Sequence, residues 1–392
     1  MARRCRRIVA AGAASILMTG CVAADLISPE SVSADAMSGL AQPPPVPPTD
    51  YQVLATGLQA PNALAITPDG TTLVADGPQL LRYRLDQPLE PIQHNLTSVL
   101  GEATDLLSLA ASPAFSYNRE LYVCHRTASD LRVTRISLDD ELERAEAGAT
   151  LLTDLPLPEN EADRGCQVGF GPDGLLYVGT SDGGDPSTPQ DLTSLGGKIL
   201  RLDPLTGAAP DSNPFADRSD MVTQLVYSYG HRAVTGLAWH PASGQLYAID
   251  RGPGREDEIN VVVAGGNYGW NPASASVTEY RTEGVPMTDL SLPNARPAAY
   301  NSGDVSQQLG PATFISGAQW GAFEADLAIS NLTGPRLWFL HVTGEVVGQP
   351  MTLNSPDPGG SSVALAQHPN GDLLALSSNS GVNRLVCVRV IQ

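Results

Sequence analysis

The sequence is short of positive charge, of lysine and of long apolar runs. It carries 23 Lys and Arg residues against 42 Asp and Glu residues, which gives a formal net charge of −19 at pH 7. Lys198 is the only lysine, and we expect its stem to pack while its ammonium group pairs on the surface. So acidic a chain lacks the basic face that nucleic acid requires. We therefore exclude nucleic acid as a partner.

One apolar run stands out, and it lies at the N-terminus. Residues 8–18 are apolar and follow four arginines, which is typical of an export signal. The run ends in Leu-Met-Thr-Gly-Cys21, which resembles a bacterial lipobox, so residues 1–20 are predicted to be a lipoprotein-type signal peptide. An ordinary secretory signal with an incidental cysteine is the alternative. No second run is long enough to cross a bilayer. We expect a location in the bacterial cell envelope, anchored by a lipid on Cys21.

Cysteine is scarce, with five residues in the chain. Cys5 lies in the predicted signal and Cys21 at its end, which leaves Cys124, Cys166 and Cys387. An exported protein folds where disulfides can form. A bridge between Cys124 and Cys166 is one possibility that the sequence leaves open, and one thiol must remain unpaired.

Amphipathic helical periodicity is almost absent, and a strand–turn–strand unit recurs instead. Residues 21–50 are rich in Pro, Ala and Ser and predict a tether. Beyond them, six segments share an apolar strand, a turn with Pro or Gly, and a second strand. These segments are 62–76, 106–123, 166–180, 235–249, 313–329 and 363–376. Repeats of this kind are typical of propellers, so residues 51–392 are predicted to form an all-β, six-bladed β-propeller.

The innermost strands of a propeller surround an axial channel, and a ligand usually binds at one mouth of that channel. Residues that come just before each innermost strand should line this mouth. In this chain they are Asn62, 103–105, Asp163, Arg232, Phe314 and 361–363. The mouth is therefore where we expect the functional site.

The segment 227–270 contains the densest set of candidate ligand-binding residues. Its apolar runs 235–239 and 245–249 flank a Pro-Ala-Ser-Gly turn, which predicts a β-hairpin. The loop that follows combines Gly252-Pro253, an acidic cluster at 256–258 and Gly-Gly-Asn-Tyr-Gly at 265–269. Glycines allow close approach of the backbone, and carbonyl and carboxylate oxygens suit calcium. The alternative is an acidic, solvated turn.

Two blocks of motifs give the chain a specific family resemblance. The first reads GHR…GLAWHP, then DEIN and NYGW, and the second reads FGPDGLLYVGTSDGG…PQDLTSLGGKILRLDP. From residue 51 to the C-terminus the sequence resembles the soluble PQQ-dependent sugar dehydrogenases, the glucose/sorbosone dehydrogenase family. The resemblance implies a six-bladed propeller that oxidises an aldose at its anomeric hydroxyl. It also implies a small sugar as the partner.

The resemblance further implies positions for the cofactor-binding and catalytic residues. PQQ carries three carboxylates and needs several cations, and the oxidation needs a general base. Asp163 stands where the family has its catalytic histidine, Asp182 matches the aspartate that orients this base, and Arg232 matches a cofactor-binding arginine. The other cofactor positions fall on residues that carry no charge: Ala103, Ala233, Thr333, Ser361 and Val363. We therefore predict that PQQ binds weakly or not at all.

The resemblance also implies calcium. One ion would lie on the backbone carbonyls of Gly252 and Pro253, and a further ion would be held by Glu258 and the carbonyl of Tyr268. Carbonyl and carboxylate oxygens at these positions have the hard-ligand chemistry that calcium prefers. The alternative is that the carboxylates cap ordinary turns.

Three functions remain open on the sequence. The first is a PQQ-dependent sugar dehydrogenase with altered cofactor binding. The second is a calcium-stabilised propeller that binds a carbohydrate or a protein without redox chemistry. The third is a metal-dependent, lactonase-like hydrolase that uses Asp163, Asp182 and Glu258.

Several conspicuous side chains are expected to have structural roles. We expect His231 to be a hydrogen-bonded structural residue beside Arg232 rather than a base. Trp239, Trp320 and Trp338 should pack within the blades, which is the commoner use of a large aromatic side chain.

Overall fold

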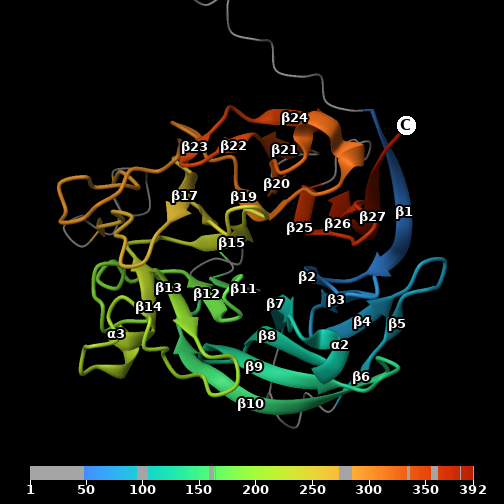
Figure 1. The fold of residues 1–392 in the computed structure, drawn as a ribbon, viewed down its shortest axis with the longest axis horizontal. Coiled ribbons are helices and arrows are strands. Elements are labelled where there is room, and N and C mark those ends of the chain that lie inside the picture. The colour runs from blue at the N-terminus through green and yellow to red at the C-terminus, as the bar shows by residue number, and fades with distance from the viewer. Residues whose placement is uncertain are drawn as a thin grey trace, which may run out of the picture. The chain divides into compact units, whose positions relative to one another are not determined.

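The computed structural model describes residues 48–94, 105–158, 163, 165–272, 285–332, 336–354, 361–379 and 381–391. The predicted signal, Cys21 and almost all of the tether lie outside the described residues, as do Ala103 and Thr333. The described residues belong to one compact unit, Pro45–Gln392. In this unit six sheets of four or five strands surround a common axis (Figure 1). The prediction of an all-β, six-bladed β-propeller is confirmed.

Each blade is built on an antiparallel meander whose strands run outward in chain order, except that the first described strand of the chain forms the outer strand of the last blade and a short extra strand adds a parallel edge to the second. Blade 1 contains β2 (Pro61–Ile66), β3 (Thr72–Asp76), β4 (Gln79–Tyr83) and β5 (Glu90–Pro91). Blade 2 contains β7 (Asp105–Ala111), β8 (Glu120–Arg126), β9 (Leu131–Leu138) and β10 (Arg144–Leu155), with β6 (Gln93–His94) parallel to β10 at its edge. Blade 3 contains β11 (Cys166–Phe170), β12 (Leu176–Thr180), β13 (Lys198–Leu202) and β14 (Val226–Tyr229).

The remaining blades follow the same plan. Blade 4 contains β15 (Val234–Trp239), β16 (Leu246–Asp250), β17 (Glu258–Val262) and β18 (Tyr300–Asn301). Blade 5 contains β19 (Leu309–Phe314), β20 (Leu327–Asn331), β21 (Arg336–Leu340) and β24 (Met351–Asn354), with the hairpin of β22 (Val342–Thr343) and β23 (Val346–Val347) inserted. Blade 6 contains β25 (Ser361–Gln367), β26 (Leu373–Asn379), β27 (Val382–Val390) and β1 (Thr49–Leu58).

Helices are short and lie between strands. Among the described residues they are α2 (Phe115–Asn118), α3 (Met221–Leu225) and the 3-10 helix η4 (Ala318–Phe323). No helix within the described part of the chain is both long and apolar enough to cross a membrane.

The hydrophobic core is divided among the blades, because successive side chains of a strand point to opposite faces of its sheet. In β2, Ala63 packs in the cluster shared by blades 1 and 2, whereas its neighbour Leu64 packs in the cluster shared by blades 6 and 1. The same alternation gives one apolar cluster between every two neighbouring blades. Each blade therefore needs both neighbours to bury its faces, which is why the ring closes.

Closure of the ring joins the two ends of the described chain. Strand β1 pairs with β27, with Thr49 opposite Val390 and Leu58 opposite Asn383. The N-terminal strand thus completes the last blade (Figure 1), and the sheet begins just before the expected start of the propeller at residue 51.

A disulfide joins blades 2 and 3. Cys124 of β8 and Cys166 of β11 are bonded, with their Cα atoms 6.3 Å apart, whereas Cys387 is a buried free thiol. This settles the pairing that the sequence left open. Burial raises the pKa of the Cys387 thiol to about 12, so this cysteine stays protonated and unreactive at neutral pH.

The six predicted repeats coincide with the two inner strands of the six blades, but one predicted mouth residue is misplaced. Phe314 is the last residue of β19, not the residue before it. Its ring packs edge-on against His240 and Tyr247 at the opposite end of the channel. The error arose because Pro311 lies inside β19, and a proline is rarely expected within a strand.

Candidate functional site

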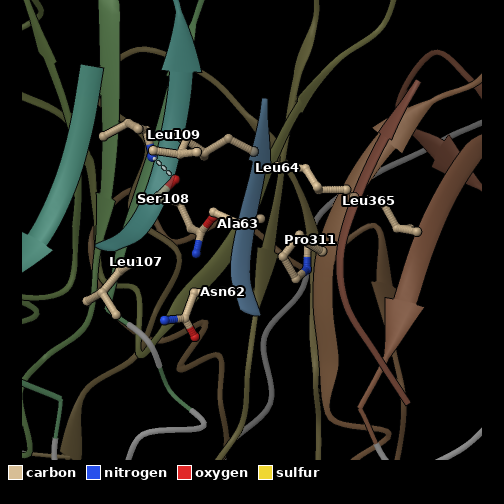
Figure 2. Close-up of a pocket in the computed structure, with 14 residues that line it drawn as sticks. Asn62, Ala63, Leu64, Leu107, Ser108, Leu109, Pro311 and Leu365 are labelled. Atoms are coloured by element: carbon tan, nitrogen blue, oxygen red, sulfur yellow. Dashed lines mark hydrogen bonds between the residues drawn. The ribbon is translucent and has the colours of Figure 1, made fainter. Parts of the chain in front are cut away.

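The axial channel is lined by the inner strands of all six blades, and Figure 2 labels the lining residues that come from β2, β7, β19 and β25. Its cavity has a volume of about 100 Å³, which is room for a few ordered waters. Asn62, Ser108 and Gln167 supply polar side chains among otherwise apolar ones, and Ser108 Oγ accepts a hydrogen bond from the Val168 amide at 3.1 Å. We use the word mouth for the end of this channel at which β2, β7, β11, β15, β19 and β25 begin.

Two predicted site residues form an ion pair at the mouth. Arg232 comes just before β15 and Asp163 just before β11, and the guanidinium meets the carboxylate through two contacts of 3.1 and 3.4 Å. Their side chains are only 11% and 9% exposed. Asp163, for which the resemblance led us to expect a histidine, therefore neutralises the arginine that was expected to hold the cofactor.

The same guanidinium also donates a hydrogen bond to the Gly252 carbonyl, at which calcium was expected. Arg232 Nη1 donates to the carbonyl of Arg251 at 2.9 Å and to that of Gly252 at 3.2 Å. Pro253 follows with a partly exposed side chain. A calcium ion on the Gly252 carbonyl would lie against a fixed positive charge, so this carbonyl does not suit the ion that the resemblance implies.

Asp182, the second catalytic candidate, reaches the mouth from the loop after β12. Its Oδ2 accepts a hydrogen bond from Trp270 Nε1 at 2.8 Å, and its Oδ1 accepts one from the Gly184 amide at 3.0 Å. Its own amide donates to the carbonyl of Arg232 at 2.8 Å. Asp163 and Asp182 thus both contact Arg232, one through its side chain and the other through its backbone.

Behind the mouth lies a fully buried network that the sequence did not predict. His231 Nδ1 is 3.1 Å from Asp250 Oδ2, and His231 Nε2 is 2.9 Å from Ser228 Oγ. Asp250 also accepts hydrogen bonds from the amides of Arg232 and Ala233. All three side chains of the network are at most 1% exposed, so no substrate reaches them. His231 is structural, as expected.

Glu258 and Tyr268 both border this buried network, with Asp250 opposite Glu258 in the sheet and Tyr268 beside His231. Glu258 is 1% exposed, accepts from Thr288 Oγ1 at 2.7 Å and from Asn260 Nδ2 at 3.3 Å. Burial, with the neighbouring Asp250, raises its pKa to about 8. Tyr268 stacks on His231 with ring centres 4.7 Å apart and donates to the Val261 carbonyl. Within the described residues, no group of three or more His, Cys, Asp or Glu side chains could hold a metal.

A second contact between the two motif blocks was also missed. Gln190 and Asn267 exchange two amide hydrogen bonds of 3.0 Å each, and Gln190 Nε2 also donates to the Trp270 carbonyl at 2.9 Å. This pair holds the loop that carries Asp182 against the segment that carries Trp270. The only sequence signal was that both amides lie in the motifs that carry the family resemblance.

Lys198 is buried, which corrects the expectation of a surface ion pair. It is 0% exposed, and its Nζ donates to the carbonyls of Thr188, Pro189 and Gly196 at 2.6, 3.1 and 2.5 Å. Burial lowers its pKa to about 7, partly offset by Asp191 and Asp182. The single lysine therefore fixes the loop between β12 and β13 from inside.

We expect Lys198→Met to lower the free energy of unfolding by about 3 kcal/mol, because buried carbonyls lose their donor. The lowered pKa means that the unfolded lysine keeps its proton between pH 7 and 10.5 while the folded one releases it, so this group adds stability as the pH rises. The difference in unfolding free energy between wild type and Lys198→Met, measured by urea unfolding, should therefore increase from pH 7 to pH 9. Arg218→Met, at an exposed position, is the matched control. A difference that decreases would contradict the expectation.

Comparison with known proteins gives consistent matches over most of the propeller. The family model described as Glucose / Sorbosone dehydrogenase matches residues 58–385. Aldose sugar dehydrogenase YliI of Escherichia coli is 28% identical over 63% of this chain and 66% of its own length. Quinoprotein glucose dehydrogenase B of Acinetobacter calcoaceticus is 27% identical over 56% of this chain and 52% of its own. The matched regions thus span less than two thirds of these relatives.

A solved structure covers more of the chain. The PQQ-bound form of aldose sugar dehydrogenase from Streptomyces coelicolor superposes with a TM-score of 0.69 and 26% identity, over 88% of this chain and 99% of that one.

Proposed function

Because the chain belongs to the glucose/sorbosone dehydrogenase family, we propose that it recognises a small sugar at the mouth of its propeller and does not use PQQ to oxidise that sugar. The observation that carries the proposal is the ion pair between Asp163 and Arg232. This pair leaves the mouth arranged for a neutral ligand rather than for a tricarboxylate.

The residues at the mouth do not fit PQQ. Arg232 is already bound by the Asp163 carboxylate and two carbonyls. Arg251, the neighbouring guanidinium, is 3% exposed, donates to the Leu309 carbonyl at 3.0 Å and interacts with Asp163 and Asp257. A cofactor carboxylate would have to displace Asp163, and breaking a buried ion pair costs about 3–5 kcal/mol. We derive no catalytic step through PQQ.

A neutral sugar makes fewer demands on these residues. Its hydroxyl groups can donate to carboxylate oxygens that already accept one hydrogen bond, because a carboxylate has about four acceptor sites. Asp163 and Asp182 are such carboxylates at the mouth. Asn62 and Gln167 add amide groups along the channel. Relatives named as aldose and glucose dehydrogenases supply the class of ligand. The lactonase-like alternative gains no support, because it needs a metal group that the described residues do not form.

We also propose that the protein carries out this function outside the cytoplasm. The disulfide between Cys124 and Cys166 supports the location, because such bonds persist in oxidising compartments. The predicted signal and lipid anchor on Cys21 agree with it. Release of the full chain from membranes by a lipoprotein-specific treatment, but not by salt, would support the anchor.

The proposal is tested by supplying the cofactor that the family implies. The full-length chain is incubated with PQQ and calcium, and bound PQQ is measured by equilibrium dialysis; dye reduction is then followed with D-glucose. The Acinetobacter quinoprotein glucose dehydrogenase B serves as the positive control. We expect PQQ affinity at least 100-fold below that of the control and no dye reduction, while saturation-transfer NMR detects D-glucose. Stoichiometric PQQ with glucose-dependent dye reduction would instead establish a dehydrogenase.

A further inference from the structure

A second cavity lies at the end of the propeller opposite the mouth, between blades 3 and 4. It has a volume of about 270 Å³, more than twice that of the axial channel. Its walls come from the β11–β12 turn, which contains Asp173, and from the β15–β16 turn, which contains Ser243. The inner strands that separate it from the mouth are five and six residues long. At about 3.3 Å per residue the two sites are roughly 17–20 Å apart.

Three aromatic side chains form one wall of this cavity. The ring of Tyr177 makes edge-to-face contacts with Tyr227 and Trp239, at 5.2 and 5.4 Å between ring centres. The Cζ3 and Cη2 atoms of Trp239 lie over Gly169, where a Cβ atom would be only 2.7 Å from Cζ3. Because these atoms are on the opposite edge of the indole from Nε1, it is this edge of Trp239, and not its N–H edge, that contacts Gly169. Unlike the buried Trp320 and Trp338, Trp239 remains partly exposed.

Several polar atoms of the cavity are left for a ligand. Among the described residues, neither Trp239 Nε1 nor Tyr227 Oη has a hydrogen-bond partner within the protein, and neither is sealed from solvent. Gln245 uses its Nε2 to donate to the carbonyls of Leu246 and Val262 at 3.0 and 2.7 Å. Its amide oxygen is therefore held in place as an acceptor. The cavity thus offers donors and an acceptor beside aromatic rings.

The charges around the cavity are already matched. Asp173 Oδ2 accepts from Arg201 Nε at 3.0 Å, from Arg201 Nη2 at 2.7 Å and from Tyr177 Oη at 3.0 Å. The guanidinium also lies 5.8 and 5.5 Å from the ring centres of Tyr177 and Tyr227. Because this pair is neutral overall, a charged ligand would find no counter-ion here. A neutral ligand with many hydroxyl groups needs no counter-ion and would therefore suit this cavity.

We propose that this cavity binds one ring of a neutral carbohydrate, as a site separate from the mouth. Sugar rings present C–H faces to aromatic side chains and hydroxyls at their edges, and the cavity supplies Trp239 and Tyr227 for the first and Gln245 for the second. A volume of about 270 Å³ admits one such ring. Pockets that combine aromatic walls with a few placed polar groups are the usual form of small-ligand sites.

The test uses methyl α-D-glucopyranoside, whose anomeric hydroxyl is blocked. Binding to the full chain is measured by saturation-transfer NMR titration, with wild type compared with Trp239→Phe and Tyr227→Phe. Tyr227→Phe removes one unpartnered hydroxyl and keeps its ring, so its thermal unfolding should stay close to wild type. Trp239→Phe removes the indole N–H and also shortens the ring that packs over Gly169, so its folding is checked by thermal unfolding before the titration. Tyr300→Phe, a partly exposed tyrosine in blade 4 that packs against Trp338, is the matched control. We expect millimolar binding that weakens at least fivefold in both variants and is unchanged in the control.

Two results would overturn the proposal. One is the absence of saturation transfer to this glucoside. The other is equal affinity in wild type, Trp239→Phe and Tyr227→Phe, which would place the sugar elsewhere on the chain. Neither result bears on the exclusion of PQQ from the mouth, which is tested separately by bound PQQ and dye reduction.

Discussion

Asp250→Ala is expected to lower the free energy of unfolding by about 4 kcal/mol or more. Asp250 is 1% exposed and accepts hydrogen bonds from His231, Arg232 and Ala233. Alanine would leave two backbone amides and an imidazole buried without an acceptor, and each such loss costs about 1–3 kcal/mol. The segment that carries Arg232 would lose its anchor at the same time.

A second variant separates the contribution of the shape of Asp250 to stability from that of its charge. Asp250→Asn keeps an oxygen for the two backbone amides, and its NH₂ group can donate to His231 if the imidazole adopts its other tautomer. We expect a loss of about 1–2 kcal/mol for this variant, since a hydrogen bond to a charged acceptor is replaced by a neutral one.

Urea unfolding followed by tryptophan fluorescence measures both effects. Asp211→Ala, at an exposed position, is the control and should stay within about 0.5 kcal/mol of wild type. A loss below about 1 kcal/mol for Asp250→Ala would show that water replaces the carboxylate, and the buried network would then not be what holds the mouth.

The fold could be predicted from the sequence because its evidence is local. A strand, a tight turn and a second strand recur six times, and each copy signals itself through alternating side chains and a turn residue. The Phe314 error shows the limit of that evidence. Pro311 interrupts the apolar pattern of β19, so the strand seemed to begin later than it does.

The site could be predicted only in part, because its contacts join distant segments. Asp163 and Arg232 were identified as mouth residues, but they stand 69 positions apart and in different blades. Their pairing follows from ring geometry, which no local pattern encodes. Asp250 was overlooked for a related reason, since it ends the apolar run of β16 and resembles a strand-terminal polar residue.

Lys198 and the cysteines show the same contrast, because their contacts join segments that no local sequence pattern connects. Nothing near Lys198 indicates burial, and its three carbonyl partners come from a loop that folds back over β13. The disulfide was one of several possible pairings by sequence alone, and the neighbouring positions of β8 and β11 select it.

Asp163→His is expected to raise the affinity for PQQ by about 100-fold or more. The substitution removes a negative charge from the mouth and releases the guanidinium of Arg232 from its carboxylate partner. A like-charge contact at ~4 Å costs on the order of 4 kcal/mol at an effective dielectric of about 20. Relief of two thirds of this cost would raise the affinity for PQQ about 100-fold, since each 1.4 kcal/mol corresponds to a factor of ten in affinity.

The same substitution should weaken the fold. Arg232 would be left buried without its counter-ion, and removing one partner of a buried pair costs about 3–5 kcal/mol. Thermal unfolding of Asp163→His should therefore occur at a lower temperature than in wild type, and PQQ should restore part of the difference. Stabilisation by the cofactor would itself measure its affinity, because a ligand that binds only the folded state raises stability by mass action.

Equilibrium dialysis with PQQ and calcium checks the affinity, with Asp185→Asn as the control. Asp185 is exposed and lies in the same loop as Asp182, so its substitution changes the net charge without touching Arg232. If Asp163→His and Asp185→Asn raised the affinity equally, only the net charge of the chain would matter. If neither raised it, the pairing of Arg232 would not be what excludes the cofactor. An increase confined to Asp163→His would identify this ion pair as one feature that keeps PQQ from the mouth.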